Sequence, residues 1–311
     1  MALFQAAVQM HGDALDTAAG VAAFTAGASF ETTRLAADDI AALRDRVPQG
    51  TLVYVSELPS RPLDEQLAVV ETLRAAGVEP VPHLAVRSFA NADALSDHVA
   101  RLVERAAVTR VLVIGGDRTA PAGPFRAAIE LIESGILQSR GIREIGVAGY
   151  PDGHPRIAPI ALERALAAKL AAAEETGLAA HIVTQFSVSP EPIVAWLTRL
   201  RDQGVDTRVH VGFAGPTSVA GLLRFARICG VRASAQGLAR NVGLARNMLG
   251  SAAPDRVVRP VAAACAADRL GDVTAHFYAF GGLAATLRWV AATAAGRIEL
   301  DTAGGFSVAP P

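Results

Sequence analysis

Eight short apolar runs, each followed by a segment with helical spacing, limit the fold of this chain more than any other feature. The runs are rich in Val, Ile and aromatic residues and show little polar alternation. This is typical of parallel strands that are covered on both faces. They lie at 28–33, 51–57, 79–85, 110–116, 143–150, 181–186, 208–214 and 273–280.

The segments between the runs predict amphipathic helices. Residues 63–77 place leucine and valine on one face and end at Gly77, and residues 92–107 behave alike. The helix expected at 191–204 follows Ser189 and Pro190, a typical helix start. We expect at least two helices within 216–270, and further helices before the first strand and after the eighth.

Strands and helices that alternate eight times predict a closed (β/α)8 TIM barrel with additional helices. The length of 311 residues suits one such barrel, which needs ~250 residues, so we expect a single catalytic domain over 1–311. A doubly wound open sheet is the alternative. No GxGxxG motif follows the first strand, which favours the barrel.

Composition excludes several classes of protein. The net charge of −1 argues against a nucleic-acid partner, and the apolar stretches fall short of the ~18–20 residues that span a membrane. Cys229 and Cys265 have neither metal-ligand spacing nor a disulfide framework, and the start of the chain does not resemble a secretory signal. We expect a cytoplasmic protein with reduced thiols and leave a homo-oligomer open.

Polar side chains end nearly every predicted strand, where barrel enzymes place their chemistry. Singly, each has a structural explanation: a carboxylate can cap a helix, a histidine can be satisfied in the core, and a tyrosine can pack. Together they favour a functional site. They are Glu31, Ser56, Glu57, His83, Asp117, Tyr150, His154, Gln185 and Tyr278.

Two of these carboxylates suggest acid–base chemistry. Glu31 and Asp117 follow strands one and four, so we expect them to face each other across the barrel mouth. Burial can raise the pKa of one and make it an acid, while the other stays ionised beside a developing cation. Gln185 offers a donor and an acceptor to an amide-bearing heterocycle. No metal-ligand pattern and no GxSxG motif is present.

Six motifs, in order, resemble those of the methylenetetrahydrofolate reductases. SFE resembles the end of that family's first strand, GGD its RGD, AGYPDGHP its AxYPExHP, VTQF its ITQF and HFYAF its HFYTL; PHL is the same in both. The similarity covers about residues 28–290. The motifs lie at 29–31, 82–84, 115–117, 148–155, 183–186 and 276–280.

This resemblance implies a flavin-dependent reductase that acts on a folate substrate, with FAD as cofactor and NADH or NADPH as electron donor. Glu31 would be the general acid that protonates N10 of the folate, and Asp117 would favour the cationic iminium. Gln185, Asp117 and Tyr278 would bind substrate. The cofactor would be bound by Ser56, His83, Gly116, Asp117, Ala148, Tyr150, His154 and Lys169.

Departures from the family pattern cluster on the cofactor contacts. SFETTRL lacks the aromatic and proline residues that follow the acid, and GGD lacks an arginine. Lys169 is the only base in the helix at 165–175, Val219 stands near the place of a stacking aromatic, and Gly282 replaces an arginine. Three alternatives therefore stay open: direct hydride transfer from NAD(P)H without flavin, a non-catalytic folate-binding paralogue, and a pterin methyltransferase.

Overall fold

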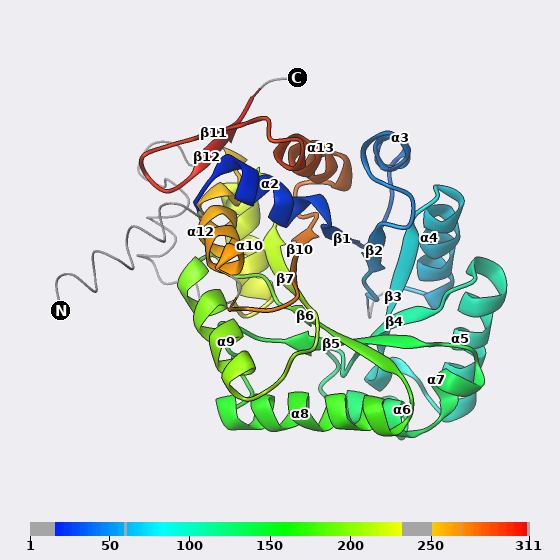
Figure 1. Ribbon diagram of the computed structural model, residues 1–311. Coiled ribbons are helices and arrows are strands. Elements are labelled where there is room, and N and C mark those ends of the chain that lie inside the picture. Colours follow the sequence, from blue (N-terminus) through cyan, green and yellow to red (C-terminus); the bar gives the residue numbers. More distant parts are fainter. Residues whose placement is uncertain (1–15, 59–60, 232–250, 268, 310–311) are drawn as a thin grey trace. The chain divides into compact units, whose positions relative to one another are not determined.

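The protein forms a closed barrel of eight parallel strands, in the order β1-β10-β7-β6-β5-β4-β3-β2 (Figure 1). The computed structural model describes residues 16–58, 61–231, 251–267 and 269–309. Seven of the eight predicted apolar runs contain one whole barrel strand, and the run at 181–186 overlaps β6, which begins two residues earlier at Ala179. The strands are β1 (Ser29–Thr32), β2 (Leu52–Val55), β3 (Glu79–Ala85), β4 (Arg110–Ile114), β5 (Glu144–Gly149), β6 (Ala179–Thr184), β7 (Val209–Ala214) and β10 (Val273–Tyr278).

Helices follow the strands where their spacing predicted them. They are α2 (Ala18–Ala26), α3 (Ala37–Arg46), α4 (Leu63–Ala75), α5 (Ala92–Ala106), α6 (Ala128–Glu133), α7 (Ile136–Ser139), α8 (Pro159–Glu175), α9 (Pro190–Asp202), α10 (Val219–Ile228), α12 (Asp255–Ala266) and α13 (Leu283–Ala294), with a 3₁₀ turn η1 at Val86–Ser88. The region 216–270 contains α10 and α12, as expected; its part at 232–250 lies outside the described residues.

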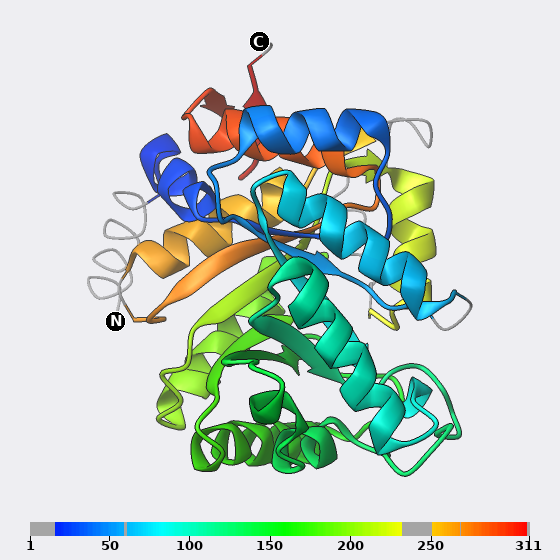
Figure 2. The same ribbon diagram turned by 90° about the vertical axis from the view of Figure 1, so that its right-hand side faces the viewer.

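Contacts within the chain define two compact units, which we describe separately. Unit 2 comprises 29–150 and 156–183, with β1 to β5, β6 up to Val183, and α3 to α8. Its strands pair in parallel register, for example Glu31 with Tyr54 across β1 and β2. Helices α4 and α5 lie side by side (Figure 2), and α4 buries Leu67, Val70 and Leu73.

Unit 1 comprises 1–28, 151–155 and 184–311. Its strands β7 and β10 pair along their whole length, from Val209–Val273 to Ala214–Tyr278. Helix α2 packs against α12 and α13. Two short antiparallel pairs were not predicted: β8 (Thr217–Ser218) with β9 (Ser251–Ala252), and β11 (Ile298–Leu300) with β12 (Phe306–Val308).

The length and the apolar character of the helices determine whether any of them could span a membrane. Within the described ranges, no helix is both long enough and apolar enough to cross a bilayer.

Candidate active site

The carboxyl group of Glu31 lies between two polar side chains of neighbouring strands. The Ser56 hydroxyl donates a hydrogen bond of 2.5 Å to Glu31 Oε1, and His83 Nε2 lies 3.4 Å from Glu31 Oε2. The side chains of Glu31 and His83 are only 12% and 8% exposed. Unit 2 therefore brings together three of the predicted site residues around one nearly enclosed carboxyl group.

Strand alternation and one buried glutamine hold this arrangement. Ser56 continues β2 by donating its backbone N–H to Thr32 of β1 at 3.0 Å, so its side chain lies at the end of both strands. Gln66 of α4 donates its amide to the carbonyl oxygens of Val55 and His83, each at 3.0 Å. The backbones that carry Ser56 and His83 are thus tied to the same helix.

Glu57 has a structural role beside this cluster. Its Oε2 accepts the Ala85 backbone N–H at 2.9 Å, which joins the ends of β2 and β3. Burial raises the pKa of this carboxyl, while the nearby Ser88 hydroxyl, the hydrogen bond from Ala85 and the nearby His83 oppose the shift. Sequence reasoning noted this residue at the strand end, and the structure places it against backbone.

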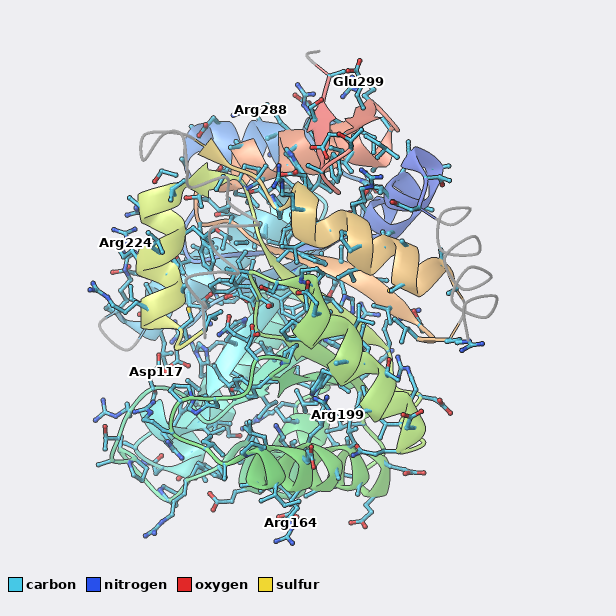
Figure 3. The ribbon with its side chains drawn as sticks, turned by 90° about the vertical axis from the view of Figure 1, so that its left-hand side faces the viewer. Asp117, Arg164, Arg199, Arg224, Arg288 and Glu299 are labelled. Carbon is cyan, nitrogen blue, oxygen red and sulfur yellow. The ribbon has the colours of Figure 1, made fainter. Side chains whose placement is uncertain are left out.

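Asp117 lies in different surroundings from Glu31. It is exposed (Figure 3), and it follows Gly116, whose φ of +86° and close approach to Ala85 exclude a side chain. Burial raises the pKa of the Tyr150 hydroxyl, and the charge of Asp117 adds to this shift. No hydrogen bond or ion pair joins Asp117 to Glu31 in the described part of the chain. The two carboxyl groups nevertheless differ in environment, because that of Glu31 is enclosed and that of Asp117 is exposed. Such a difference is what allows one carboxyl to act as an acid while the other stays ionised.

Unit 1 carries three further predicted residues. Gln185 follows β6, and its Oε1 accepts the Phe186 backbone N–H at 3.0 Å. Tyr278 ends β10, and its hydroxyl donates to the Thr184 carbonyl at 2.9 Å, one residue before Gln185. Within this unit the ends of β6 and β10 are therefore tied together. His154 is half-buried in the segment 151–155.

An aromatic column beside Tyr278 was missed by sequence reasoning. The rings of Phe225 and Phe280 stack at 4.1 Å with an interplanar angle of 9°, and Tyr278 stacks on Phe280 at 5.6 Å. The Arg224 guanidinium, on the outer side of α10 (Figure 3), lies 4.8 Å from the Phe225 ring centre. The alternating aromatics of HFYAF are the signal that could have indicated this column.

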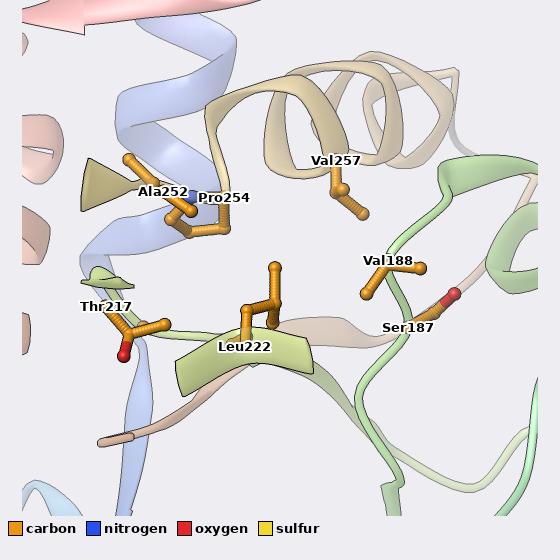
Figure 4. A pocket seen from close by; sticks show the side chains of 10 residues that line it. Ser187, Val188, Thr217, Leu222, Ala252, Pro254 and Val257 are labelled. Carbon is orange, nitrogen blue, oxygen red and sulfur yellow. The ribbon is translucent and has the colours of Figure 1, made fainter. Parts of the chain in front are cut away.

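A small, mostly apolar pocket opens in unit 1 (Figure 4). Its walls include Val188, Leu222, Pro254 and Val257, and hydroxyl groups come from Ser187 and Thr217. None of the predicted site residues lines it. The pocket starts two residues after Gln185, so it belongs to the same strand end without sharing its polar groups.

The flavin that the resemblance implies can be tested against the polar groups of unit 2. The Ser56 hydroxyl and the His83 Nε2 both face Glu31. The space beside Gly115, where the family motif has an arginine, contains the Arg87 guanidinium, which donates to the carbonyls of Arg118 at 3.4 Å and Arg126 at 2.6 Å. The Ser56 hydroxyl and the Arg87 guanidinium are engaged within the protein, so these two groups fit a flavin poorly; His83 Nε2 is buried and makes no hydrogen bond within the described part of the chain, so of these three groups it alone keeps a donor or acceptor for a bound group.

Lys169 is a different case among the predicted cofactor contacts, and it is the only lysine in the sequence. It is half-buried in α8, and burial lowers the pKa of its amine to about 8. No carboxylate pairs with it among the residues that the structure describes, so it could still meet an anionic group. Ala148 lies within β5. The described residues contain no group of three potential metal ligands.

Comparison with known structures supports the fold. An uncharacterised protein from Clostridium thermocellum that binds two copies of 5-methyl-5,6,7,8-tetrahydrofolic acid aligns with a TM-score of 0.53 and 10% identity, over 86% of this chain and 93% of that one. A D-hydantoinase aligns with a TM-score of 0.34 and 12% identity, over 57% of this chain and 41% of that one, and at that score it supports no inference.

The sequence itself matches a family model. The model that describes methylenetetrahydrofolate reductase matches residues 60–247, more than half of the 311 residues. The matched part includes the PHL, GGD, YPDGHP and VTQF motifs, and Glu31 precedes it. On this match, the chain belongs to the methylenetetrahydrofolate reductase family.

Proposed function

We propose that this protein interconverts 5,10-methylenetetrahydrofolate and 5-methyltetrahydrofolate by hydride transfer, with Glu31 as the general acid. The observation that carries the proposal is the enclosed Glu31 carboxyl, which the Ser56 hydroxyl and His83 contact at the end of β1 in a member of this family. Folate binding by a protein of similar fold supports the substrate class. The cytoplasmic location stays a prediction.

The proposed reaction needs one proton and one hydride. Glu31 donates its proton to N10, the bond between N10 and the bridging carbon breaks, and a cationic iminium forms at N5. Hydride then reaches this carbon and gives the 5-methyl group, while NADH or NADPH is oxidised to NAD⁺ or NADP⁺. Asp117, exposed and negatively charged, would favour the cation, and Gln185 and Tyr278 would bind the folate.

Replacing the acid tests this proposal. We expect Glu31→Gln to lower kcat by a factor of about 10²–10⁴, the range of general acid catalysis, with folate affinity retained. Isothermal titration with 5-methyltetrahydrofolate measures the affinity, and NAD(P)H oxidation measures turnover. A wild-type protein that binds folate and never turns over would make it a non-catalytic folate-binding paralogue. Methyl transfer without nicotinamide would indicate a methyltransferase instead.

A second form of the reaction, with hydride passing directly from the nicotinamide to the iminium, is favoured by the engaged polar groups of unit 2. Ser56 and His83 face Glu31, and Arg87 fills the space beside Gly115. We derive no step through a flavin for this reason. We expect a colourless purified protein that oxidises NAD(P)H when methylenetetrahydrofolate is added.

Two measurements distinguish the forms. The absorption spectrum before and after addition of FAD reports flavin binding, and stoichiometric flavin would refute direct transfer while leaving the folate chemistry in place. The rate at which an amine-reactive reagent labels Lys169 gives a second readout, which reports whether an anionic group is bound at this amine. An anion bound there would stabilise the ammonium form and slow labelling at pH 8, because burial holds the pKa of the free amine at about 8.

A further inference from the structure

The side-chain amide of Gln66, in α4, contacts two strands and a second helix, all within unit 2. Its Nε2 donates hydrogen bonds to the carbonyl oxygens of Val55 and His83, each at 3.0 Å. Its Oε1 lies 3.2 Å from Nε2 of His98 in α5. Gln66 and His98 are only 6% and 3% exposed. Buried polar groups need hydrogen-bond partners, and both polar atoms of this amide have them. We call these two side chains the Gln66–His98 clamp.

The donors and acceptors of an amide fix the direction of these hydrogen bonds. Carbonyl oxygens only accept, so the Gln66 Nε2 uses its two hydrogens on Val55 and His83. The Gln66 oxygen also only accepts, so the hydrogen between the two side chains is on His98 Nε2. Burial lowers the pKa of His98 to about 4, so near pH 7 its ring is neutral. A flipped amide would place its oxygen against two carbonyl oxygens and its Nε2 against the His98 donor. His98 therefore locks the orientation of Gln66.

The clamp lies where the backbone pairing of β2 with β3 ends. The last paired residues are Val55 and Pro82, and Gln66 joins the Val55 carbonyl to that of His83, one residue further along β3. Pro80 and Pro82 have no N–H to donate, and the register of β3 with β4 begins at His83. A strand with two prolines forms fewer backbone hydrogen bonds, so the position of its end depends more on side chains such as Gln66.

Both strands that the clamp joins carry a side chain that contacts the Glu31 carboxyl. Ser56 directly follows Val55, and its hydroxyl donates to Glu31 Oε1 at 2.5 Å. His83 Nε2 lies 3.4 Å from Oε2 of the same carboxyl. Each carboxyl oxygen thus has one of these two neighbours, and Gln66 holds the backbone beside both of them.

We propose that Gln66, oriented by His98, is a positioning residue for the general acid, which sets the spacing of β2 and β3 that places Ser56 and His83 against Glu31. The proposal rests on the proposed function. The clamp acts through the backbone, because the strand atoms that receive its hydrogen bonds are the carbonyl oxygens of Val55 and His83. A shift of either carbonyl changes a contact to Glu31.

Gln66→Met tests this, because it keeps most of the side-chain volume and removes all three hydrogen bonds. The hydrogen bond from Ala85 to Glu57 still joins β2 and β3, so we expect the variant to fold. On the acidic plateau of the pH profile, kcat for NAD(P)H oxidation should fall by a factor of about 10–100, with KM for the folate changed less than about twofold. A purely structural role would lower the melting temperature and leave kcat unchanged.

A titration of the Glu31 carboxyl gives a readout that needs no turnover. It is followed by ¹³C NMR of the full chain labelled at glutamate, and the Glu31 signal is assigned by its loss in Glu31→Gln. In Gln66→Met we expect the midpoint to rise by at least about 0.3 pH unit, because a displaced Ser56 hydroxyl stabilises the ionised form less well. In the Ser56→Ala background the same substitution should move the midpoint by less, since that hydroxyl is gone. An equal shift in both backgrounds would contradict positioning through Ser56.

His98→Phe is the second variant, which removes the donor to Gln66 and keeps a ring beside Phe89. We expect a smaller shift of the midpoint in the same direction. The matched control is Gln138→Met, which removes another hydrogen bond of unit 2 from a glutamine to a carbonyl, that of Thr176 at 3.2 Å, and should leave kcat and the midpoint unchanged.

The titration decides the proposal separately from the reaction. An unchanged midpoint in both Gln66→Met and His98→Phe, with the fold intact by circular dichroism, overturns the positioning role. A shifted midpoint supports that role even where the wild type shows no turnover, an outcome that would refute the proposed reaction alone.

Discussion

At the scale of single residues, Ser56 acts directly on the Glu31 carboxyl. The Ser56 hydroxyl donates to Glu31 Oε1 at 2.5 Å, which stabilises the ionised form. The pH at which Glu31 can serve as an acid should therefore depend on this hydroxyl.

A prediction for the variant Ser56→Ala follows from this hydrogen bond. Without the hydroxyl, the carboxylate loses a hydrogen bond, so we expect the alkaline limb of the reductive kcat profile to move upward by about 0.5–1 pH unit. The pH dependence of kcat at saturating substrate measures it. Ser56→Thr, which keeps the hydroxyl, is the control and should keep the wild-type profile. A downward shift in Ser56→Ala would contradict the assignment.

Because of Glu144, the free energy of unfolding should depend on pH. Its pKa is lowered from 4.5 to about 2, chiefly by the hydrogen bond from His181. A carboxyl whose pKa is lower in the folded protein than in the unfolded chain stabilises the folded state. This contribution to the free energy of unfolding is complete above the pKa of the unfolded chain, and it is lost as the pH falls toward the pKa of the folded protein. The contribution is at most about 3 kcal/mol.

Urea unfolding at several pH values measures this effect. Between pH 6 and pH 3, the free energy of unfolding should fall more steeply in the wild type than in Glu144→Gln. Equal slopes in the two proteins would show that Glu144 has an ordinary pKa in the folded state.

At the scale of helices and strands, the residue directly after α5 is the one residue other than glycine that has a positive φ among the described residues. Ala107 ends this helix with a φ of 48° and a ψ of 40°. The left-handed conformation crowds a Cβ against the backbone, and glycine avoids that cost. We expect Ala107→Gly to raise the free energy of unfolding by about 0.5–1 kcal/mol. Thermal unfolding checks it, with Ala106→Gly, inside the helix, as a control that should destabilise.

Local sequence predicted the elements well because burial and turn chemistry are local. The runs of valine and isoleucine located all eight barrel strands, and Ser189 with Pro190 located the start of α9. The β11–β12 hairpin was not predicted. Its strands have three residues each, and Arg259 of α12 donates to the carbonyls of Asp301 and Gly305 in the turn between them, which is a contact between distant segments.

The candidate site was predicted only in part, because contacts between distant segments leave no local pattern in the sequence. Strand-end residues such as Glu31, Ser56 and His83 could be found because every barrel places chemistry there. The buried hydrogen bond between Tyr54 and His181 was missed, since these two residues are 127 positions apart and meet only because of strand register. A tyrosine and a histidine inside apolar runs were the available signal. Their usual explanation is packing.

At the scale of the whole molecule, the expectation of one domain over 1–311 stays a prediction. The closed strand order includes strands of both units, β7 and β10 from one and β1 to β5 from the other. We therefore expect one cooperative transition in differential scanning calorimetry, with the calorimetric enthalpy equal to the van't Hoff enthalpy. Two resolved transitions would instead make the units independent folding domains. The comparison uses the full chain without added ligand.

Helix α2 has a consequence for the way this chain is made. Its buried side chains Val21 and Phe24 belong to a helix that packs against α12, α13, β10 and β11, which are among the last elements to be synthesised. A ribosome that adds ~5–20 residues per second therefore leaves this apolar face uncovered for on the order of tens of seconds. Unit 2, which ends at Val183, has all of its residues before the synthesis of α12 begins at Asp255. The nascent protein must therefore shield α2 until the strands that cover it emerge.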